Sequence, residues 1–352
     1  MRIGIDYRLA KRHLGGMAVY LKDLVHQLKK IDHNNEYILF DDNPSASSGF
    51  KKQAWTIIWE HIWIQLCLPY FFWKKDIAVA YFPNPPVSFF STIPIILTIP
   101  DVSFIYESSL PKWIKWYLWI IYFLSASRAH SITTFSQNSK KDIERIFKVS
   151  SDKIAITPLA AADELVPQKP ASGPKKPYII TVPGTLIPRK NVDEAILAFK
   201  KLPQNLIDAY QLYIVGNAKG NDFERLQILV LNEGLFGKVI FTGTITDQEL
   251  SRLFSDAKLF VCSSLYEGFG LSTLAAMKCG VPVISYSNSS LPEVTGDAGI
   301  LVNNVEELSR AMKNVLTDKT LQMKLRKKGL KHSRRYSWEN TATIFLTNLN
   351  AV

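Results

Sequence analysis

The sequence predicts an α/β protein built from two doubly wound domains, and three observations lead to this prediction. Short apolar strand patterns alternate with longer helical patterns along all 352 residues, which is typical of parallel sheets joined by crossover helices. The chain is too long for one ordinary core and suits two domains of similar size. A stretch rich in proline and lysine near the middle interrupts the alternation, as a linker would.

The first domain is expected to span residues 1–165. Its strand patterns lie near residues 2–6, 37–40, 77–81, 94–99, 131–135 and 154–157. Its helical patterns lie between these strands, near residues 17–30, 55–67, 112–126 and 138–147. Because each strand is followed by a helix, the sheet is expected to be parallel.

The second domain is expected to span residues 178–337, after a linker at 166–177. Its strand patterns lie near residues 178–182, 212–215, 239–241, 259–261 and 281–285. A final amphipathic helix over 338–352 is expected to pack, with the N-terminal domain as the candidate surface. In doubly wound sheets ligands bind at the carboxyl ends of the strands, so a cleft between the domains is the predicted site.

The composition limits the function classes. The formal net charge of +11 favours a polyanionic partner, which leaves nucleic acid, an anionic membrane and a phosphorylated substrate open. The three cysteines lack metal-ligand spacing, so we expect free thiols, no metal site and a reducing compartment. The N-terminus begins as a strand without the features of a signal peptide, and a cytoplasmic location is expected.

Two loops carry glycines or cations where a strand gives way to a helix. Gly15 and Gly16 precede the helix near residue 17, where backbone amides can approach a phosphate, although paired glycines are more often ordinary turns. Gly184, Arg189 and Lys190 lie in the loop after the strand at 178–182. A planar guanidinium beside an ammonium suits a diphosphate, and the alternative is a solvated pair.

The strongest motif follows the strand at 259–261. It reads Tyr266-Glu267-Gly268-Phe269-Gly270-Leu271 and opens a helix. The two glycines free the backbone to donate amide hydrogens, while Glu267 offers a carboxylate to sugar hydroxyls.

These motifs resemble glycosyltransferase family 4. The resemblance rests on Glu267 to Gly280, Val281-Pro282-Val283-Ile284, and Ser289-Ser290-Leu291-Pro292-Glu293-Val294. The segments Arg2 to Tyr20, Trp59-Glu60, Thr98 to Phe104, and Gly184 to Asn191 follow in the family's order and spacing. The resemblance therefore covers nearly the whole chain, and it implies the GT-B fold, with two Rossmann-like domains facing each other across a cleft. The domain at 1–165 would be the acceptor side, and the domain at 178–337 would bind the nucleotide-sugar donor.

The resemblance implies a retaining, metal-independent hexosyltransferase without a cofactor, acting in cell-surface polysaccharide synthesis such as that of the lipopolysaccharide O-antigen. Its donor would be a nucleoside diphosphate sugar, and its acceptor a saccharide, expected to be lipid-linked. The predicted catalytic residues are Glu267, Arg189, Lys190 and Asp101, where Asp101 has helix capping as its alternative role. The predicted donor-binding residues are Gly15, Gly16, Gly184, Arg189, Lys190, Tyr266, Glu267, Gly268, Phe269, Gly270 and Leu271.

Two positions depart from the family pattern. Ala275 stands where the family has a second glutamate that binds the ribose, and Pro100 stands where it has a histidine that contacts the donor. One hypothesis is that the lost histidine accompanies a 6-deoxyhexose donor. The alternative to an enzyme is a catalytically silent GT-B subunit that binds a partner glycosyltransferase or a glycan.

Tryptophan is concentrated in the first domain, where seven of the eight lie between residues 55 and 119. Trp55, Trp59 and Trp63 recur every four residues, and Trp113 and Trp116 lie near lysines. Indoles beside lysines suit peripheral contact with the inner face of a membrane, and the alternative is that these helices cover the first sheet. A nucleic-acid partner is not expected, because the chain carries no recognised motif for one.

Overall fold

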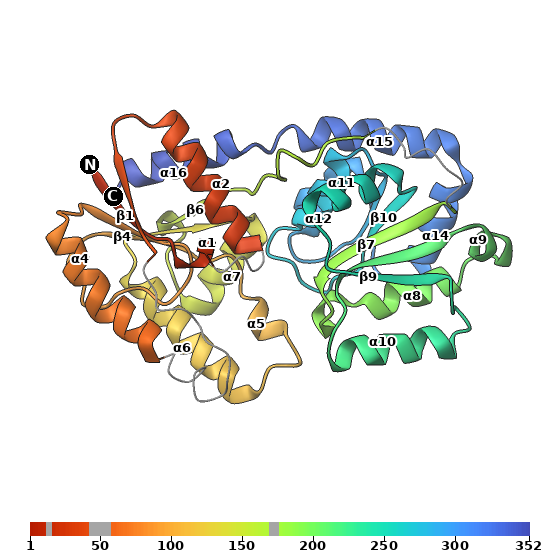
Figure 1. The fold of residues 1–352 in the computed structure, drawn as a ribbon, viewed down its shortest axis with the longest axis horizontal. Coiled ribbons are helices and arrows are strands. Elements are labelled where there is room, and N and C mark those ends of the chain that lie inside the picture. The colour runs from red at the N-terminus through yellow and green to blue at the C-terminus, as the bar shows by residue number, and fades with distance from the viewer. Residues whose placement is uncertain (12–15, 42–57, 169–175) are drawn as a thin grey trace. The chain divides into compact units, whose positions relative to one another are not determined.

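The computed structural model describes residues 1–11, 16–41, 58–168 and 176–352 in two compact units (Figure 1). Unit 1 comprises Met1–Phe104, Pro111–Leu159 and Trp338–Val352, and unit 2 comprises Ile105–Leu110 and Ala160–Ser337. The C-terminal helix thus belongs to unit 1, and a six-residue segment from the first half of the chain belongs to unit 2. Gly15, Trp55 and residues 169–175 of the expected linker lie outside the described residues.

Unit 1 is organised around a six-stranded parallel sheet with the order β2-β1-β3-β4-β5-β6. The strands are β1 (Arg2–Asp6), β2 (Glu36–Phe40), β3 (Val79–Phe82), β4 (Ile95–Thr98), β5 (Ser131–Thr134) and β6 (Ile154–Ile156). β1 pairs with both β2 and β3, and Ile5 lies opposite Leu39 and Tyr81. Every residue of β3, β4 and β5 is buried, as expected for a parallel sheet covered on both faces.

The helices of unit 1 are α1 (Arg8–Lys11), α2 (Gly16–Ile31), η1 (Trp63–Cys67), α4 (Leu68–Lys74), α6 (Lys112–Arg128), α7 (Gln137–Phe147), η2 (Ser151–Lys153) and α16 (Trp338–Asn350). Helix α5 (Ser103–Tyr106) begins in unit 1 and ends in the segment that belongs to unit 2. The hydroxyl of Thr341 in α16 donates to the carbonyl of Pro158 at 2.5 Å, and Ser131 donates to Asn348 at 2.7 Å. These contacts fix the C-terminal helix on unit 1.

The helix expected near residues 55–67 continues to Lys74, although Pro69 interrupts its sequence. Proline lacks an N–H group and its ring crowds the carbonyl four residues earlier. The chain accommodates this with a single π-helical segment, η1, immediately before α4, which has its proline in the first turn. The side chain of Gln65 in η1 donates to the carbonyl of Val87 at 2.9 Å and accepts from the amide of Phe89 at 2.8 Å.

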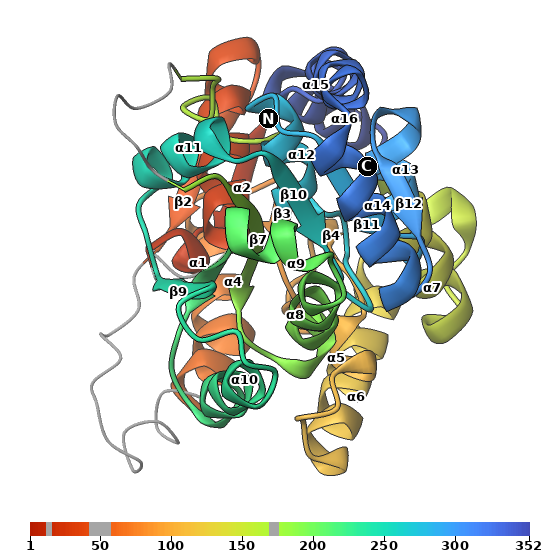
Figure 2. The ribbon, with the colours of Figure 1, turned by 90° about the vertical axis from the view of Figure 1, so that its right-hand side faces the viewer.

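Unit 2 is organised around a second six-stranded parallel sheet, with the order β12-β11-β10-β7-β8-β9. Its strands are β7 (Tyr178–Thr185), β8 (Gln211–Asn217), β9 (Val239–Gly243), β10 (Leu259–Cys262), β11 (Val283–Tyr286) and β12 (Ile300–Val302). Its helices are η3 (Pro188–Lys190), α8 (Val192–Lys200), α9 (Gln204–Ala209), α10 (Asn221–Asn232), α11 (Asp247–Asp256), α12 (Leu271–Lys278), α13 (Leu291–Thr295), η4 (Gly296–Ala298), α14 (Val305–Thr317) and α15 (Lys319–Ser333). Helices α8 and α10 lie on one face of the sheet and α12 and α15 on the other (Figures 1 and 2).

The predicted fold class of two doubly wound parallel sheets is confirmed. Strand β12 is an addition, because a three-residue strand gives too short an apolar run to stand out in the sequence. Among the described residues, no helix combines the length and apolar character needed to cross a bilayer.

The position of Trp63 contradicts the prediction that the tryptophans of the helix before Pro69 form an exposed surface. Its side chain is only 6% exposed and packs 5.7 Å from the ring of Phe71, so it belongs to the core of unit 1. Trp59 is half-buried. By contrast, Trp113 and Trp116 on α6 are 72% and 67% exposed. Helical spacing alone does not distinguish the two cases, because burial depends on which face of the helix meets the sheet.

Candidate functional site

The first loop of the candidate site leads from β7 into α8. Gly184 has a φ of +73°, a region in which side chains are strained. A Cβ on Gly216 of the adjacent β8 would lie 2.8 Å from the carbonyl oxygen of Gly184, so the two backbones approach too closely for a side chain. The turn η3 then places Arg189 and Lys190 just beyond the carboxyl end of β7.

The second loop leads from β10 into α12 and carries Glu267. The amide of Glu267 donates to the hydroxyl of Ser289 at 2.9 Å, and Ser290 donates to the carbonyl of Glu267 at 2.7 Å. Gly270, just before α12, has a φ of +101°, and a Cβ there would lie 3.0 Å from Leu291. The loop after β11 therefore fixes the backbone of the loop after β10.

The two loops meet through charged side chains. The ammonium of Lys190 donates to Oε1 of Glu267 at 2.6 Å, and the two side chains are 15% and 14% exposed. Nη1 of Arg189 donates to the carbonyl of Tyr266 at 2.5 Å and lies 3.9 Å from Oε2 of Glu267. Burial raises the pKa of Glu267, but Lys190 and then Arg189 outweigh it and hold the pKa below its ordinary value. Glu267 is therefore a carboxylate at neutral pH.

Two residues that the sequence did not suggest complete this cluster. The segment Ile105–Leu110 brings Oε2 of Glu107 to 3.8 Å from Nε of Arg189, and within the described part of the chain neither atom has a hydrogen-bond partner. The ring of Tyr106 stacks on that of Tyr266, with centroids 4.4 Å apart. No motif marks Glu107, since its place depends on the path of the folded chain.

The remaining predicted site residues fall into two groups. Gly268, Phe269, Gly270 and Leu271 share unit 2 with the charged cluster, and Gly268, Phe269 and Gly270 are buried. Gly16 and Asp101 belong to unit 1. Gly16 is the first residue of α2, and the Asp101 carboxylate accepts from the amide of Ser103 at 2.7 Å, as a helix-capping residue does.

The two departures from the family pattern also have clear places. Ala275 is buried in α12, where its neighbours Leu274, Ala276 and Met277 are buried as well. Pro100 follows β4, and its carbonyl accepts a long hydrogen bond of 3.4 Å from Thr134. Neither position presents a side-chain hydrogen-bonding group.

The cluster can bind a ligand that combines phosphate with hydroxyl groups. Arg189 offers a planar fork of donors and Lys190 a compact positive charge, and both bind phosphate oxygens well. Glu267 can accept hydrogen bonds from hydroxyls. Within the described residues, no group of three or more histidine, cysteine, aspartate or glutamate side chains is placed to hold a metal ion.

The fold defines a class, the GT-B glycosyltransferase fold. The structure matches sucrose-phosphate synthase from Thermosynechococcus elongatus with a TM-score of 0.79 at 17% sequence identity, covering 100% of both chains. It matches Anabaena HepE in complex with UDP and glucose with a TM-score of 0.76 at 16% identity, again covering 100% of both. At these identities the matches establish the fold alone.

Sequence comparison adds similarities in the second half of the chain. Residues 166–332 match the model of the family described as Glycosyl transferases group 1. The chain is 34% identical over 230 residues to O-antigen chain mannosyltransferase B of Escherichia coli, a match covering 62% of this chain and 60% of that protein. It is 32% identical over 228 residues to the serotype-specific mannosyltransferase WbdA of Escherichia coli, covering 61% of this chain and 28% of that protein. The matches thus span less than two thirds of either relative.

Proposed function

We propose that the protein is a retaining, metal-independent glycosyltransferase that moves a hexose or 6-deoxyhexose from a nucleoside diphosphate sugar to a saccharide acceptor. The observation that carries the proposal is the Lys190–Glu267 contact beside Arg189, at the carboxyl end of the unit 2 sheet. This edge is where doubly wound sheets bind nucleotides. Burying charged side chains costs free energy. A ligand that contacts both the cations and the carboxylate of this cluster would explain why they are buried together.

Each charged group has a role in this reaction. Arg189 and Lys190 bind the diphosphate and stabilise the negative charge that develops as it leaves, which is the part a metal ion plays in other enzymes. Glu267 accepts hydrogen bonds from hydroxyls of the donor sugar. The acceptor hydroxyl attacks the anomeric carbon on the face that the diphosphate leaves, and its proton passes to the leaving phosphate oxygen. No protein nucleophile is then required, and the anomeric configuration is retained.

The donor sugar is the finer part of the proposal. The names of the E. coli relatives make a mannosyl donor the first to test, and polysaccharide synthesis such as that of the O-antigen the first process to test. Pro100 offers no side-chain donor to a C6 hydroxyl, which favours a 6-deoxyhexose. Side-by-side turnover of GDP-mannose, UDP-glucose and dTDP-rhamnose separates these donors. A preference for a 6-hydroxylated hexose would remove the 6-deoxyhexose from the proposal.

A nucleotide titration tests the activity itself. We expect the wild-type protein to bind one of UDP, GDP or dTDP, and Lys190→Gln to weaken that binding by about ten- to a hundredfold, because a charge-assisted contact is lost. Lys201→Gln is the matched control, since Lys201 lies in the same unit in an exposed pair with Glu306. No binding of any nucleoside diphosphate to the wild type would instead favour a silent subunit that binds a partner or a glycan.

We also propose that the acceptor is lipid-linked and that α6 contacts the surface of the membrane that holds this acceptor. An apolar stripe on α6 is exposed, and it consists of Trp113, Trp116, Tyr117, Ile120 and Leu124. Trp113, Tyr117, Ile120 and Leu124 follow one another at steps of three or four residues, and Trp116 lies three residues after Trp113 and four before Ile120, so the five share one side of the helix. The helix carries Lys112, Lys115 and Arg128 and no acidic residue. Tryptophan with lysine suits the headgroup region of an anionic leaflet.

Vesicle sedimentation tests this surface. We expect binding to phosphatidylglycerol vesicles to exceed binding to phosphatidylcholine vesicles, and the double change Trp113→Ser with Trp116→Ser to weaken it by about tenfold or more. Phe236→Ser is the control, because Phe236 is an exposed aromatic residue of unit 2. Equal losses for the two variants would refute the assignment of this face.

A further inference from the structure

Glu267 is one of four residues of unit 2 that a closed ring of hydrogen bonds connects. Its amide donates to the hydroxyl of Ser289 at 2.9 Å, and this hydroxyl donates to the side-chain oxygen of Asn288 at 3.3 Å. The side-chain amide of Asn288 donates to the carbonyl of Ser264 at 3.1 Å. Ser264 closes the ring, because its side chain hydrogen-bonds the Glu267 carboxylate. The ring therefore joins the loop after β10 to the loop after β11.

Ser289 has a backbone conformation that suits glycine better than serine. Its φ is +46°, in the left-handed region where a Cβ is disfavoured. Backbone strain alone would therefore favour glycine at this position. The hydroxyl is the group that serine supplies and glycine lacks, and it accepts the hydrogen bond from the Glu267 amide. A strained residue that directs a hydrogen-bonding group at a candidate binding residue indicates a functional constraint.

The neighbouring contacts of the same loop reach only the backbone before α12. Ser290 is fully buried and donates to the carbonyl of Glu267 at 2.7 Å, and Leu291 lies against Gly270. These contacts set the path of the chain. Asn288 and Ser289 are half-buried, and with Ser264 they form the connection that runs from the Glu267 amide to its carboxylate.

The ring holds Glu267 at both ends. Burial raises the pKa of its carboxyl group, whereas Lys190, Arg189 and the hydrogen bond from Ser264 lower it. The carboxylate is thus held by Lys190 and Ser264, while Ser289 holds the amide. With both ends fixed, the side chain between them has few rotamers left. A group that binds a reacting sugar needs such preorganisation, since a displacement of about 1 Å can lower a rate by ~10²-fold.

We propose that Asn288 and Ser289 are positioning residues that hold the Glu267 carboxylate in the orientation in which it binds the donor sugar. Asn288 suits this role because its side chain accepts from Ser289 and donates to Ser264, and an ionised aspartate could not donate. The assignment rests on the proposed function, in which Glu267 contacts the sugar. Arg189 and Lys190, which bind the diphosphate in that function, are not members of the ring. Handling of the sugar should therefore be separable from binding of the nucleotide.

Ser289→Gly tests the proposal on the full chain. The substrate is whichever of GDP-mannose, UDP-glucose and dTDP-rhamnose the wild type turns over, and the ligand for titration is the matching nucleoside diphosphate. We expect kcat to fall by about tenfold or more, because the hydroxyl that holds the Glu267 amide is lost. The Kd of the nucleoside diphosphate should stay within about twofold, and the urea unfolding curve should change little, because glycine relieves the left-handed strain. A merely structural role predicts the opposite, a loss of stability without a selective loss of kcat.

Ser287→Gly is the matched control, because Ser287 lies two residues earlier in the same loop and is exposed. It should leave kcat and the Kd unaltered. Asn288→Ala is the second variant, and it should also lower kcat by about tenfold. Combined with Ser289→Gly it should add little, because both changes break the same ring. Losses that multiply in the double variant, equal kcat in the Ser289 and Ser287 variants, or a Kd that rises as much as kcat falls would each overturn the proposal.

The wild type alone decides the proposed function. If it binds and turns over none of the three nucleotide sugars, the glycosyltransferase proposal fails, and the positioning role fails with it. If the wild type is active and Ser289→Gly keeps its kcat, the glycosyltransferase proposal stands and only the positioning role is wrong.

Discussion

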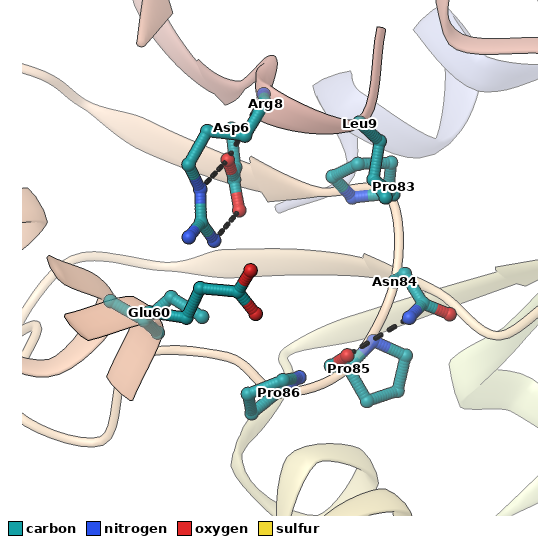
Figure 3. A pocket seen from close by; sticks show the side chains of 9 residues that line it. Asp6, Arg8, Leu9, Glu60, Pro83, Asn84, Pro85 and Pro86 are labelled. Carbon is teal, nitrogen blue, oxygen red and sulfur yellow. Dashed lines mark hydrogen bonds and ion pairs between the residues drawn. The ribbon is translucent and has the colours of Figure 1, made fainter. Parts of the chain in front are cut away.

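The carboxyl ends of the two sheets carry different charges, although the sheets share one architecture. In unit 2 the cluster contains two cations, Arg189 and Lys190, and two carboxylates, Glu107 and Glu267. In unit 1 a small cavity at the carboxyl ends of β1 and β3 is lined by one cation, Arg8, and two carboxylates, Asp6 and Glu60 (Figure 3). The first cluster is neutral as a whole and can receive an anion, whereas the second repels one. The loops, and not the fold, therefore set the class of ligand that each edge accepts.

The two clusters also differ in how firmly their cations are held. Arg8 makes two parallel hydrogen bonds to Asp6, a geometry that leaves its guanidinium fixed. Lys190 makes a single contact to Glu267, and Arg189 faces Glu107 at 3.8 Å without a hydrogen bond at its Nε. Arg189 also donates to the Tyr266 carbonyl at 2.5 Å, so among the described residues its Nε is the donor left without a partner, whereas Nε and Nη2 of Arg8 are both engaged by Asp6.

Removing the central carboxylate of unit 2 should have the largest effect. We expect Glu267→Gln to lower kcat/KM for the nucleotide sugar by about 10²–10³-fold, because the sugar loses its acceptor and Lys190 loses its counter-ion. Steady-state transfer assays measure this loss. Glu306→Gln, at an exposed pair in the same unit, should leave kcat/KM within about twofold. A similar loss in both variants would show that the cluster has no special role.

Two glycine-to-alanine changes, one in each unit, should differ in their effect on the free energy of unfolding. We expect Gly216→Ala to lower the free energy of unfolding by about 1–3 kcal/mol, since its Cβ would collide with the Gly184 backbone. Gly16→Ala, at the start of α2, should not be destabilising, because among residues 1–11, 16–41, 58–168 and 176–352 its Cβ would meet nothing within 4 Å. Urea unfolding curves for both variants give the two values. Equal stability of the two variants would mean that the close approach of β7 and β8 relaxes freely.

The sequence predicted the features that lie within one continuous loop. Arg189 and Lys190 follow a strand and precede a helix, as does Glu267, and the parallel sheet brings those loops together. Glu107 was not predicted as a site residue. Its contact with Arg189 arises because the segment Ile105–Leu110, from the first half of the chain, belongs to unit 2. Asp6 and Arg8 are close in sequence, but a short acidic and basic pair is common and reveals nothing of the cavity beside it.

The smallest expected effect tests whether Glu107 competes with the donor for Arg189. A nucleoside diphosphate that binds Arg189 must displace this carboxylate or accept its repulsion. We therefore expect Glu107→Gln to raise nucleotide affinity by about two- to fivefold, which corresponds to roughly 0.5–1 kcal/mol at a contact of this length. Calorimetric titration measures the change, and it should shrink as salt is added. Glu164→Gln, at an exposed carboxylate of the same unit, is the control. Weaker binding in Glu107→Gln would mean that Glu107 instead positions Arg189 for the phosphate. The unit 2 cluster would then need both of its carboxylates to bind the nucleotide.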